Sequence, residues 1–263
     1  MSMNEVNKTL YIPLYGKAMV SRAGIILKDT KAEQIWEKEG FPLKGKAKSK
    51  WLTYYMGMRA AVFDKWVKER LVDYPAATVL HIGCGMDSRI DRAGAKCSCW
   101  YDVDFPSVIE ERKKYYKETA SYHMIEGDAR NPSWVKDLPQ AATVIVVMEG
   151  VTMYLNNDEL AGLLFALKAH FGEVYFLADF YTEFAAKASK YKNPINEVGV
   201  SSVSGLDNPT YIREKTGLRF VCEHNMTPPE LTGELRGLDR TFFKITFTGG
   251  AAKKIYRLFE YST

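Results

Sequence analysis

The sequence is poor in cysteine and histidine, with four of each among its 263 residues. So few cysteines do not build the disulfide framework of a small secreted domain, and we expect reduced thiols. Cys97 and Cys99 form a C-x-C pair, but no second pair accompanies it and no histidine lies nearby in the sequence. This spacing does not match a structural zinc site, so the sequence predicts no metal centre.

Long hydrophobic runs are also missing. The longest apolar stretch, near residues 141–148, is far shorter than the roughly 20 residues that a membrane-spanning helix needs. The first fifteen residues lack the charged segment and apolar core of a secretory leader. We therefore expect no membrane partner and a cytoplasmic location.

Neither sign of charge dominates, because the formal net charge is only +4 at pH 7. The first fifty residues carry ten lysines and arginines against five acids, so the rest of the chain is close to neutral. Lysines alternate from Lys44 to Lys50, which suits either a solvated connector or a lid that faces an anionic ligand. A nucleic-acid patch is the weakest interpretation, and we expect no nucleic-acid partner.

Apolar, strand-like segments alternate with helical ones along the middle of the chain. The predicted strands cover residues 77–82, 99–103, 122–125, 143–148, 173–180, 218–223 and 254–261. This alternation predicts an α/β fold with a doubly wound, mostly parallel sheet and helices on both faces.

Helical periodicity is clearest at residues 51–71 and 158–171. The second of these segments follows a cap at Asn156 or Asn157 and stops before Gly172. The other assignments are short helices at 31–39 and 211–216, a segment at 242–247 that fits helix or strand, and a long loop at 193–209.

A glycine turn and three acids follow the first four predicted strands. Gly83 and Gly85 come directly after the first strand, where backbone N–H groups can approach a ligand. Asp104 lies 19 residues beyond Gly85, a spacing at which an acid can bind a ribose hydroxyl. The third and fourth strands end beside Asp128 and Glu149. Because parallel strands end at one edge of a sheet, these residues predict a nucleoside-cofactor site.

The glycine turn also helps to choose among nucleoside cofactors. A dinucleotide fingerprint has a third glycine three residues after the second, and this chain has Ser88 there. No lysine follows the glycines as it does in a phosphate-binding loop. S-adenosylmethionine has no phosphate and needs an acid for its ribose and charged partners for its amino-acid end. The residues therefore favour S-adenosylmethionine, and an NAD-linked oxidoreductase is a disfavoured alternative.

Four ordered motifs resemble those of the leucine carboxyl methyltransferase-like family, which includes the tetracenomycin-type polyketide O-methyltransferases. The motifs are HIGCGMDSR at residues 81–89, DVDFP at 102–106, GDAR at 127–130 and MEGVTMYL at 148–155. The resemblance implies a class I, Rossmann-like methyltransferase fold with a seven-stranded sheet. It also implies methyl transfer to a hydroxyl or carboxylate of a small, polyketide-like or phenolic acceptor. The alternatives are a protein C-terminal carboxyl methyltransferase and a non-catalytic S-adenosylmethionine-binding module.

The resemblance also implies a set of cofactor contacts. They are Gly83 and Gly85 at the turn, Asp104 at the ribose, Asp128 and Ala129 at the adenine, Arg59 and Glu149 at the methionine end, and Lys17 from the N-terminal segment. Asp102 remains an alternative to Asp104, and Arg22 an alternative to Lys17. Arg89 is expected to brace the turn rather than to touch substrate.

No residue in the sequence stands out as a catalytic base. Methyl transfer depends mainly on aligning the acceptor with the donor and on excluding water. Tyr154 follows the fourth motif and is the candidate that faces the acceptor. His81 is expected in the core, while His123 and His224 are weaker candidates.

We expect one methyltransferase domain, either a monomer or a homodimer. Its predicted parts are an N-terminal helical lid at residues 1–75, a cofactor-binding core at 76–180, a substrate lid at 181–217 and C-terminal strands at 218–263.

Overall fold

A computed structural model describes residues 3–41, 43, 45–94, 97–189 and 203–263 of the chain. Part of the predicted loop at 193–209 therefore lies outside the described residues. The strands are β1 (Thr78–Ile82), β2 (Cys99–Asp104), β3 (Tyr122–Glu126), β4 (Thr143–Met148), β5 (Glu173–Tyr181), β6 (Arg219–His224) and β7 (Tyr256–Ser262). Each begins and ends within two residues of its predicted range.

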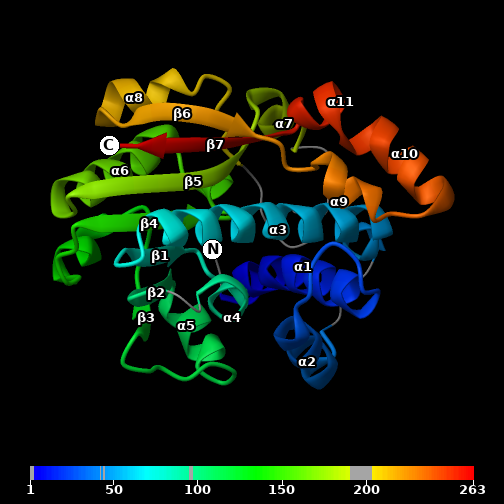
Figure 1. Cartoon of the computed structure of the whole chain (residues 1–263), viewed down its shortest axis with the longest axis horizontal. Coiled ribbons are helices and arrows are strands. Elements are labelled where there is room, and N and C mark those ends of the chain that lie inside the picture. Colours follow the sequence, from blue (N-terminus) through cyan, green and yellow to red (C-terminus); the bar gives the residue numbers. More distant parts are fainter. Residues whose placement is uncertain (1–2, 42, 44, 95–96, 190–202) are drawn as a thin grey trace.

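The strands form one sheet in the order β3-β2-β1-β4-β5-β7-β6 (Figure 1). The first five strands in this order are parallel, whereas β7 runs antiparallel to both β5 and β6. In the described part of the chain, this confirms the predicted seven-stranded, mostly parallel sheet. The antiparallel strands β7 and β6 form one edge of the sheet.

Helices cover both faces of the sheet. They are α1 (Met3–Arg22), α2 (Thr30–Glu39), α3 (Lys50–Asp73), α4 (Arg89–Ala93), α5 (Pro106–Arg112), α6 (Asn157–His170), α7 (Glu183–Ala188), α8 (Thr210–Thr216), α9 (Pro229–Gly233), α10 (Gly237–Phe247) and α11 (Gly249–Lys253), with 3-10 turns η1 (Gly45–Lys48), η2 (Pro132–Asp137) and η3 (Thr152–Tyr154). Asn156 caps α6 with a capping box. Its side-chain oxygen accepts from the backbone N–H of Glu159, and the Glu159 carboxylate accepts from the backbone N–H of Asn156. The undecided segment at 242–247 is helical.

The alternation of strand side chains divides the core into two layers. In β4, Ile145 and Val147 belong to the layer that includes α1 and α3, whereas Val144 and Val146 belong to the layer that includes α6. Both sets are fully buried, as expected for a parallel strand covered on both faces.

The helix α1 lies within the predicted N-terminal helical lid, but the sequence analysis assigns no helix to its residues. Pro13 lies inside this helix, and because proline disfavours helix interiors, the local sequence does not predict a helix here. Its packing stabilises it instead. Gly16 lets α1 approach α3 closely, since a Cβ there would lie 2.7 Å from the Cβ of Met56. In Figure 1 the two helices lie side by side, with α1 drawn in blue.

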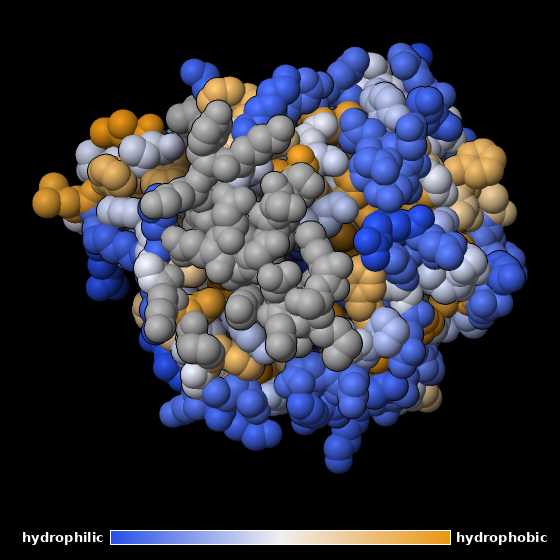
Figure 2. Space-filling model, turned by 180° about the vertical axis from the view of Figure 1, so that it is seen from behind, coloured by the Kyte–Doolittle hydropathy of each residue, from blue (hydrophilic) through white to orange (hydrophobic). Residues whose placement is uncertain are grey.

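The described surface is mostly hydrophilic in the view of Figure 2, with apolar groups standing out at the edge that carries α10. Leu238 and Ile245 of α10 are 87% and 72% exposed. None of the described helices is long and apolar enough to cross a membrane.

Candidate active site

One cavity of about 440 Å³ lies at the carboxyl ends of the parallel strands and is closed on the other side by α1 and α3. All nine residues predicted for the site line it: Lys17, Arg59, Gly83, Gly85, Asp104, Asp128, Ala129, Glu149 and Tyr154. The fold therefore brings the predicted residues together, although their contacts with a ligand stay predictions.

The turn after β1 requires glycine. Gly83 has φ +70°, a left-handed conformation, and a Cβ on it would lie 2.2 Å from a methyl carbon of Val151. Gly85 has φ +50°, and its N–H donates to a carboxylate oxygen of Asp104 over 2.8 Å. The turn thus approaches η3 closely and orients the acid at the end of β2.

The two acids of β2 have different surroundings. Asp102 is fully buried and accepts from Arg112 Nε at 2.8 Å, the Tyr122 hydroxyl at 2.6 Å and Trp100 Nε1 at 2.9 Å. Asp104 lines the cavity, and within the described part of the chain its hydrogen bonds come from the backbone N–H groups of Gly85 and Phe105. Asp104 is therefore the acid available to a ribose, and Asp102 has a structural role.

Asp104 also has an unusual charge state. Burial raises its pKa to about 6, and the hydrogen bonds from the backbone N–H groups of Gly85 and Phe105 offset only part of that effect. A buried acid without a cation partner is costly, and ribose hydroxyls are donors that would satisfy its oxygens. This observation fits a nucleoside ligand.

A buried charge cluster lies at the end of β4 and β5. Arg59 of α3 donates from Nε to Glu149 and from Nη1 to Asp179, both over 3.0 Å. Burial alone would raise the pKa of Glu149, but Arg59 and Arg89 together lower it to about 2. Glu149 is therefore ionised at neutral pH beside a buried cation. This pairing of opposite charges matches the zwitterionic amino-acid end of S-adenosylmethionine.

Asp179 is a residue of this cluster that the sequence analysis missed. Its other oxygen accepts from the N–H of Gly150 over 2.6 Å. The signal was present, because Asp179 lies near the end of the fifth strand, in line with the acids that follow the earlier strands. The residues around Asp179 are apolar and aromatic, which favours a buried strand and gives no indication of a functional acid.

Lys17 reaches the cavity from α1 and is almost completely buried. Its Nζ lies 3.0 Å from a carboxylate oxygen of Asp87, an acid of the glycine turn. Arg89 is also fully buried, donates to Asp64 over 2.8 Å and contacts Glu149. Arg89 is absent from the cavity lining, which agrees with the predicted bracing role. Arg22, the alternative to Lys17, instead pairs with Glu37 on an exposed face.

The adenine end of the predicted site is more open. Asp128 follows β3 and accepts from the guanidinium of Arg130, with Nη2 at 2.6 Å. Arg130 lies over the ring of Phe105, 5.4 Å from its centroid. Ala129 separates the two charged residues, so this part of the cavity combines a flat apolar ring with a polar rim.

The rest of the cavity is apolar and aromatic. Three tyrosines form one wall of it: the buried Tyr55 of α3 and Tyr181 of β5, and the half-buried Tyr256 of β7. The rings of Tyr181 and Tyr256 meet edge to face at 4.4 Å. Burial raises the pKa of all three hydroxyls, so they remain protonated. Sequence reasoning missed this wall, because its members come from three distant segments.

Tyr154 lies in η3 at the same cavity and is 37% exposed. Among the histidines, His81 reaches the lining, but its ring lies 3.2 Å from both Arg89 and Asp102. Burial lowers the pKa of His81, so it is a neutral core residue, as expected. His123 stacks on Tyr101, and neither it nor His224 lines the cavity.

The fold is that of solved S-adenosylmethionine-dependent methyltransferases. Magnesium protoporphyrin IX methyltransferase from Synechocystis PCC 6803, solved with bound SAH, has a similar fold, with a TM-score of 0.52 at 13% identity over 89% of this chain and 94% of that chain. The same enzyme with bound SAM gives a TM-score of 0.51 at 12% identity, over 89% and 97% of the two chains.

The model of the leucine carboxyl methyltransferase family matches residues 4–168, and the chain belongs to that family. It is 27% identical over 238 residues to the tetracenomycin polyketide synthesis O-methyltransferase TcmP of Streptomyces glaucescens, covering 89% of this chain and 88% of the relative. It is 26% identical over 243 residues to the S-adenosyl-L-methionine-dependent methyltransferase dpfgK of Gibberella zeae, covering 83% and 82%. These matches confirm the predicted family, enzyme class and cofactor.

Proposed function

We propose that the protein transfers a methyl group from S-adenosylmethionine to a hydroxyl of a flat, phenolic or polyketide-like small molecule. The observation that carries the proposal is one cavity that combines paired charges at the strand ends with a wall of tyrosines close to Arg59. The relative TcmP is a tetracenomycin polyketide synthesis O-methyltransferase, which supports this acceptor class.

The residues at the charged end would hold the cofactor. Asp104 would accept hydrogen bonds from the ribose, Asp128 and Ala129 would contact the adenine, and Arg59 with Glu149 would bind the amino-acid end. S-adenosylmethionine supplies a methyl group that is activated by a positively charged sulfonium. The helices α1 and α3 act as the predicted N-terminal lid and exclude water from the buried end.

The charges of the cavity favour a hydroxyl acceptor over a carboxylate. Three lysines or arginines belong to the described lining, and each is paired with an acid: Lys17 with Asp87, Arg59 with Glu149 and Asp179, and Arg130 with Asp128. An acceptor carboxylate would have to compete for one of these cations. A neutral aromatic acceptor would instead pack against the tyrosines, with Tyr154 of the same cavity as the candidate residue beside it.

The test is an incubation of the protein with methyl-labelled S-adenosylmethionine and three acceptor groups: polycyclic phenols, small carboxylic acids and a peptide with a C-terminal leucine. We expect label in the phenols. Label confined to acids would overturn the acceptor assignment, and label confined to the peptide would establish the protein carboxyl methyltransferase. Cofactor binding with no transfer to any acceptor would favour a non-catalytic binding module. The cytoplasmic location stays a prediction.

A further inference from the structure

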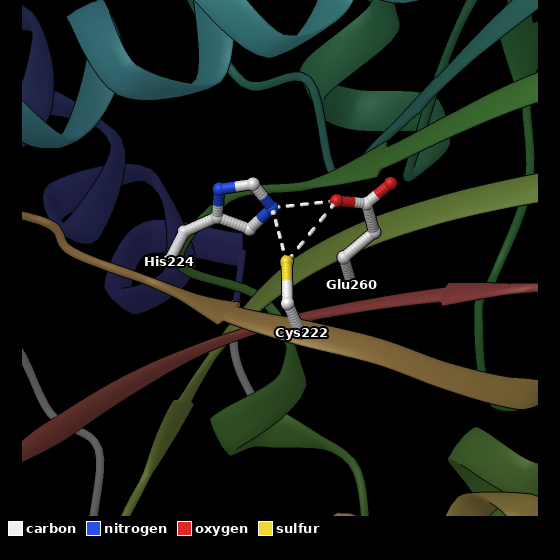
Figure 3. A group of neighbouring side chains, drawn as sticks. All are labelled: Cys222, His224 and Glu260. Carbon is white, nitrogen blue, oxygen red and sulfur yellow. Dashed lines mark hydrogen bonds and ion pairs between the residues drawn. The ribbon is translucent and has the colours of Figure 1, made fainter.

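A second group of chemically active side chains lies on the antiparallel edge of the sheet. Cys222 and His224 of β6 and Glu260 of β7 point toward one another (Figure 3). Cys222 Sγ lies 3.4 Å from His224 Nε2 and 3.6 Å from Glu260 Oε2, and these two atoms are 2.6 Å apart. None of the three residues lines the methyltransferase cavity.

Strand register explains why the three meet. Cys222 pairs directly with Glu260 across the β6–β7 ladder, so their side chains lie on the same face of the sheet. His224 follows Cys222 by two residues and therefore also faces that side. The backbone fixes the cluster, since all three residues lie within paired strands.

Two of the three separations suit a zinc ion, and the third, 2.6 Å between His224 Nε2 and Glu260 Oε2, is a hydrogen bond that the ion would replace. Zinc–ligand bonds of about 2.0–2.3 Å in a tetrahedron place the ligand atoms roughly 3.3–3.7 Å apart. The two distances from Cys222 Sγ already fall in this range. A simple hydrogen bond between His224 and Glu260 would need no thiol, yet the sulfur is close to both polar atoms.

The surroundings of Glu260 also favour a metal ligand. One carboxylate oxygen, Oε1, lies 3.5 Å from Arg70 Nη2, and the other, Oε2, faces the cysteine and histidine. A partner on the outer oxygen orients a ligating carboxylate in this way. Glu260 is buried, whereas Cys222 and His224 are half-buried, so an ion can enter from the solvent side.

We propose that Cys222, His224 and Glu260 bind one Zn²⁺ ion, with water as the fourth ligand. On binding, the thiol releases its proton to solvent, and His224 binds through Nε2 as a neutral imidazole that carries its proton on Nδ1. The thiolate and carboxylate neutralise the two charges of the ion. The site ties the edge strand β6 to β7. The sequence predicts no metal centre, because His224 and Glu260 are 36 residues apart and only the pairing of β6 with β7 brings them together.

The test uses the full chain, stripped of metal and titrated with Co²⁺ as a spectroscopic probe and then with Zn²⁺. We expect one Co²⁺ per chain with a thiolate-to-cobalt charge-transfer band and the visible spectrum of tetrahedral cobalt. Zn²⁺ should displace the Co²⁺ and remove both signals. No stoichiometric binding, or binding without the charge-transfer band, would overturn the proposal.

Variants assign the ligands. Cys222→Ser should abolish the charge-transfer band and weaken Zn²⁺ binding by at least about tenfold. Cys97→Ser is the matched control, since it also removes a half-buried thiol, and it should bind both metals as the parent chain does. His224→Gln provides a second ligand variant, and circular dichroism would verify that each variant is folded. An unchanged band in folded Cys222→Ser would contradict the assignment.

Discussion

The parallel half of the sheet and its antiparallel edge place functional groups in different ways. In the parallel half, Asp104 and Glu149 line one cavity because their strands end at one edge, and Asp179 near the end of β5 shares Arg59 with Glu149. At the antiparallel edge, Cys222 and Glu260 meet inside the ladder because of its register. The first arrangement follows from strand order in a parallel sheet, whereas the second depends on which residues pair.

The largest effect should come from removing the cation at the centre of the parallel half. Arg59→Gln leaves Glu149 and Asp179 buried without their shared partner, which should cost about 3–5 kcal/mol of unfolding free energy. Urea unfolding measures this loss. The control is Arg130→Gln, which breaks an exposed pair at the same edge and should cost less than about 1 kcal/mol. Equal losses of unfolding free energy in the two variants would contradict the expected difference between buried and exposed ion pairs.

The two acids of β2 should respond in opposite directions. Asp102→Asn weakens a buried ion pair with Arg112 and should destabilise the chain by about 2–3 kcal/mol. Above pH 6, Asp104→Asn should stabilise the chain by up to about 3 kcal/mol. The raised pKa means that the folded chain disfavours the ionised carboxylate, and the neutral amide avoids that cost.

Cofactor affinity should separate the same two variants. Asp104→Asn should weaken S-adenosylhomocysteine binding by about 10–100-fold, because an amide replaces a carboxylate that accepts from hydroxyls. Folded Asp102→Asn should bind nearly as the parent does. Calorimetry measures both affinities. Tight binding by Asp104→Asn would indicate that Asp102, rather than Asp104, binds the ribose.

Cofactor binding should also depend on pH. The pKa of Asp104 in the ligand-free protein is about 6, so the carboxyl is ionised at neutral pH and takes up a proton as the pH falls through that value. If the ligand binds the ionised form, its affinity should be about tenfold lower near pH 5 than near pH 7.5. The Asp104→Asn variant should lack this dependence. A parent profile as flat as that of the variant would contradict the role of the carboxylate.

The smallest expected effect is that of the proposed zinc site, at the antiparallel edge, on cofactor binding in the cavity. Because no residue of the Cys222, His224 and Glu260 cluster lines the cavity, removing zinc should change S-adenosylhomocysteine affinity by less than about twofold. Thermal melting should still show stabilisation of the zinc-loaded chain. A large change in cofactor affinity on chelation would mean that the two halves are coupled.

The sequence was sufficient for the features that follow from local patterns. Strand boundaries came from apolar runs, and Gly83, Asp104 and Glu149 were found because each follows a strand. The ends of parallel strands share one edge, so the same pattern that predicts the sheet also predicts that these residues gather in one cavity.

Features that depend on long-range packing were not predictable in the same way. The helix α1 contains Pro13 and is stabilised by contact with α3, which local propensity does not reveal. The wall of Tyr55, Tyr181 and Tyr256 assembles from distant segments. The edge cluster requires the register of β6 against β7, and a shift of one residue would turn Cys222 to the opposite face.

The most direct test of the account is a crystal structure of the protein with S-adenosylhomocysteine and a phenolic acceptor. We expect the ribose hydroxyls within hydrogen-bonding distance of Asp104, the amino-acid end beside Arg59 and Glu149, and the acceptor against the tyrosine wall. A ribose bound elsewhere, or an acceptor carboxylate paired with Arg59, would contradict the account.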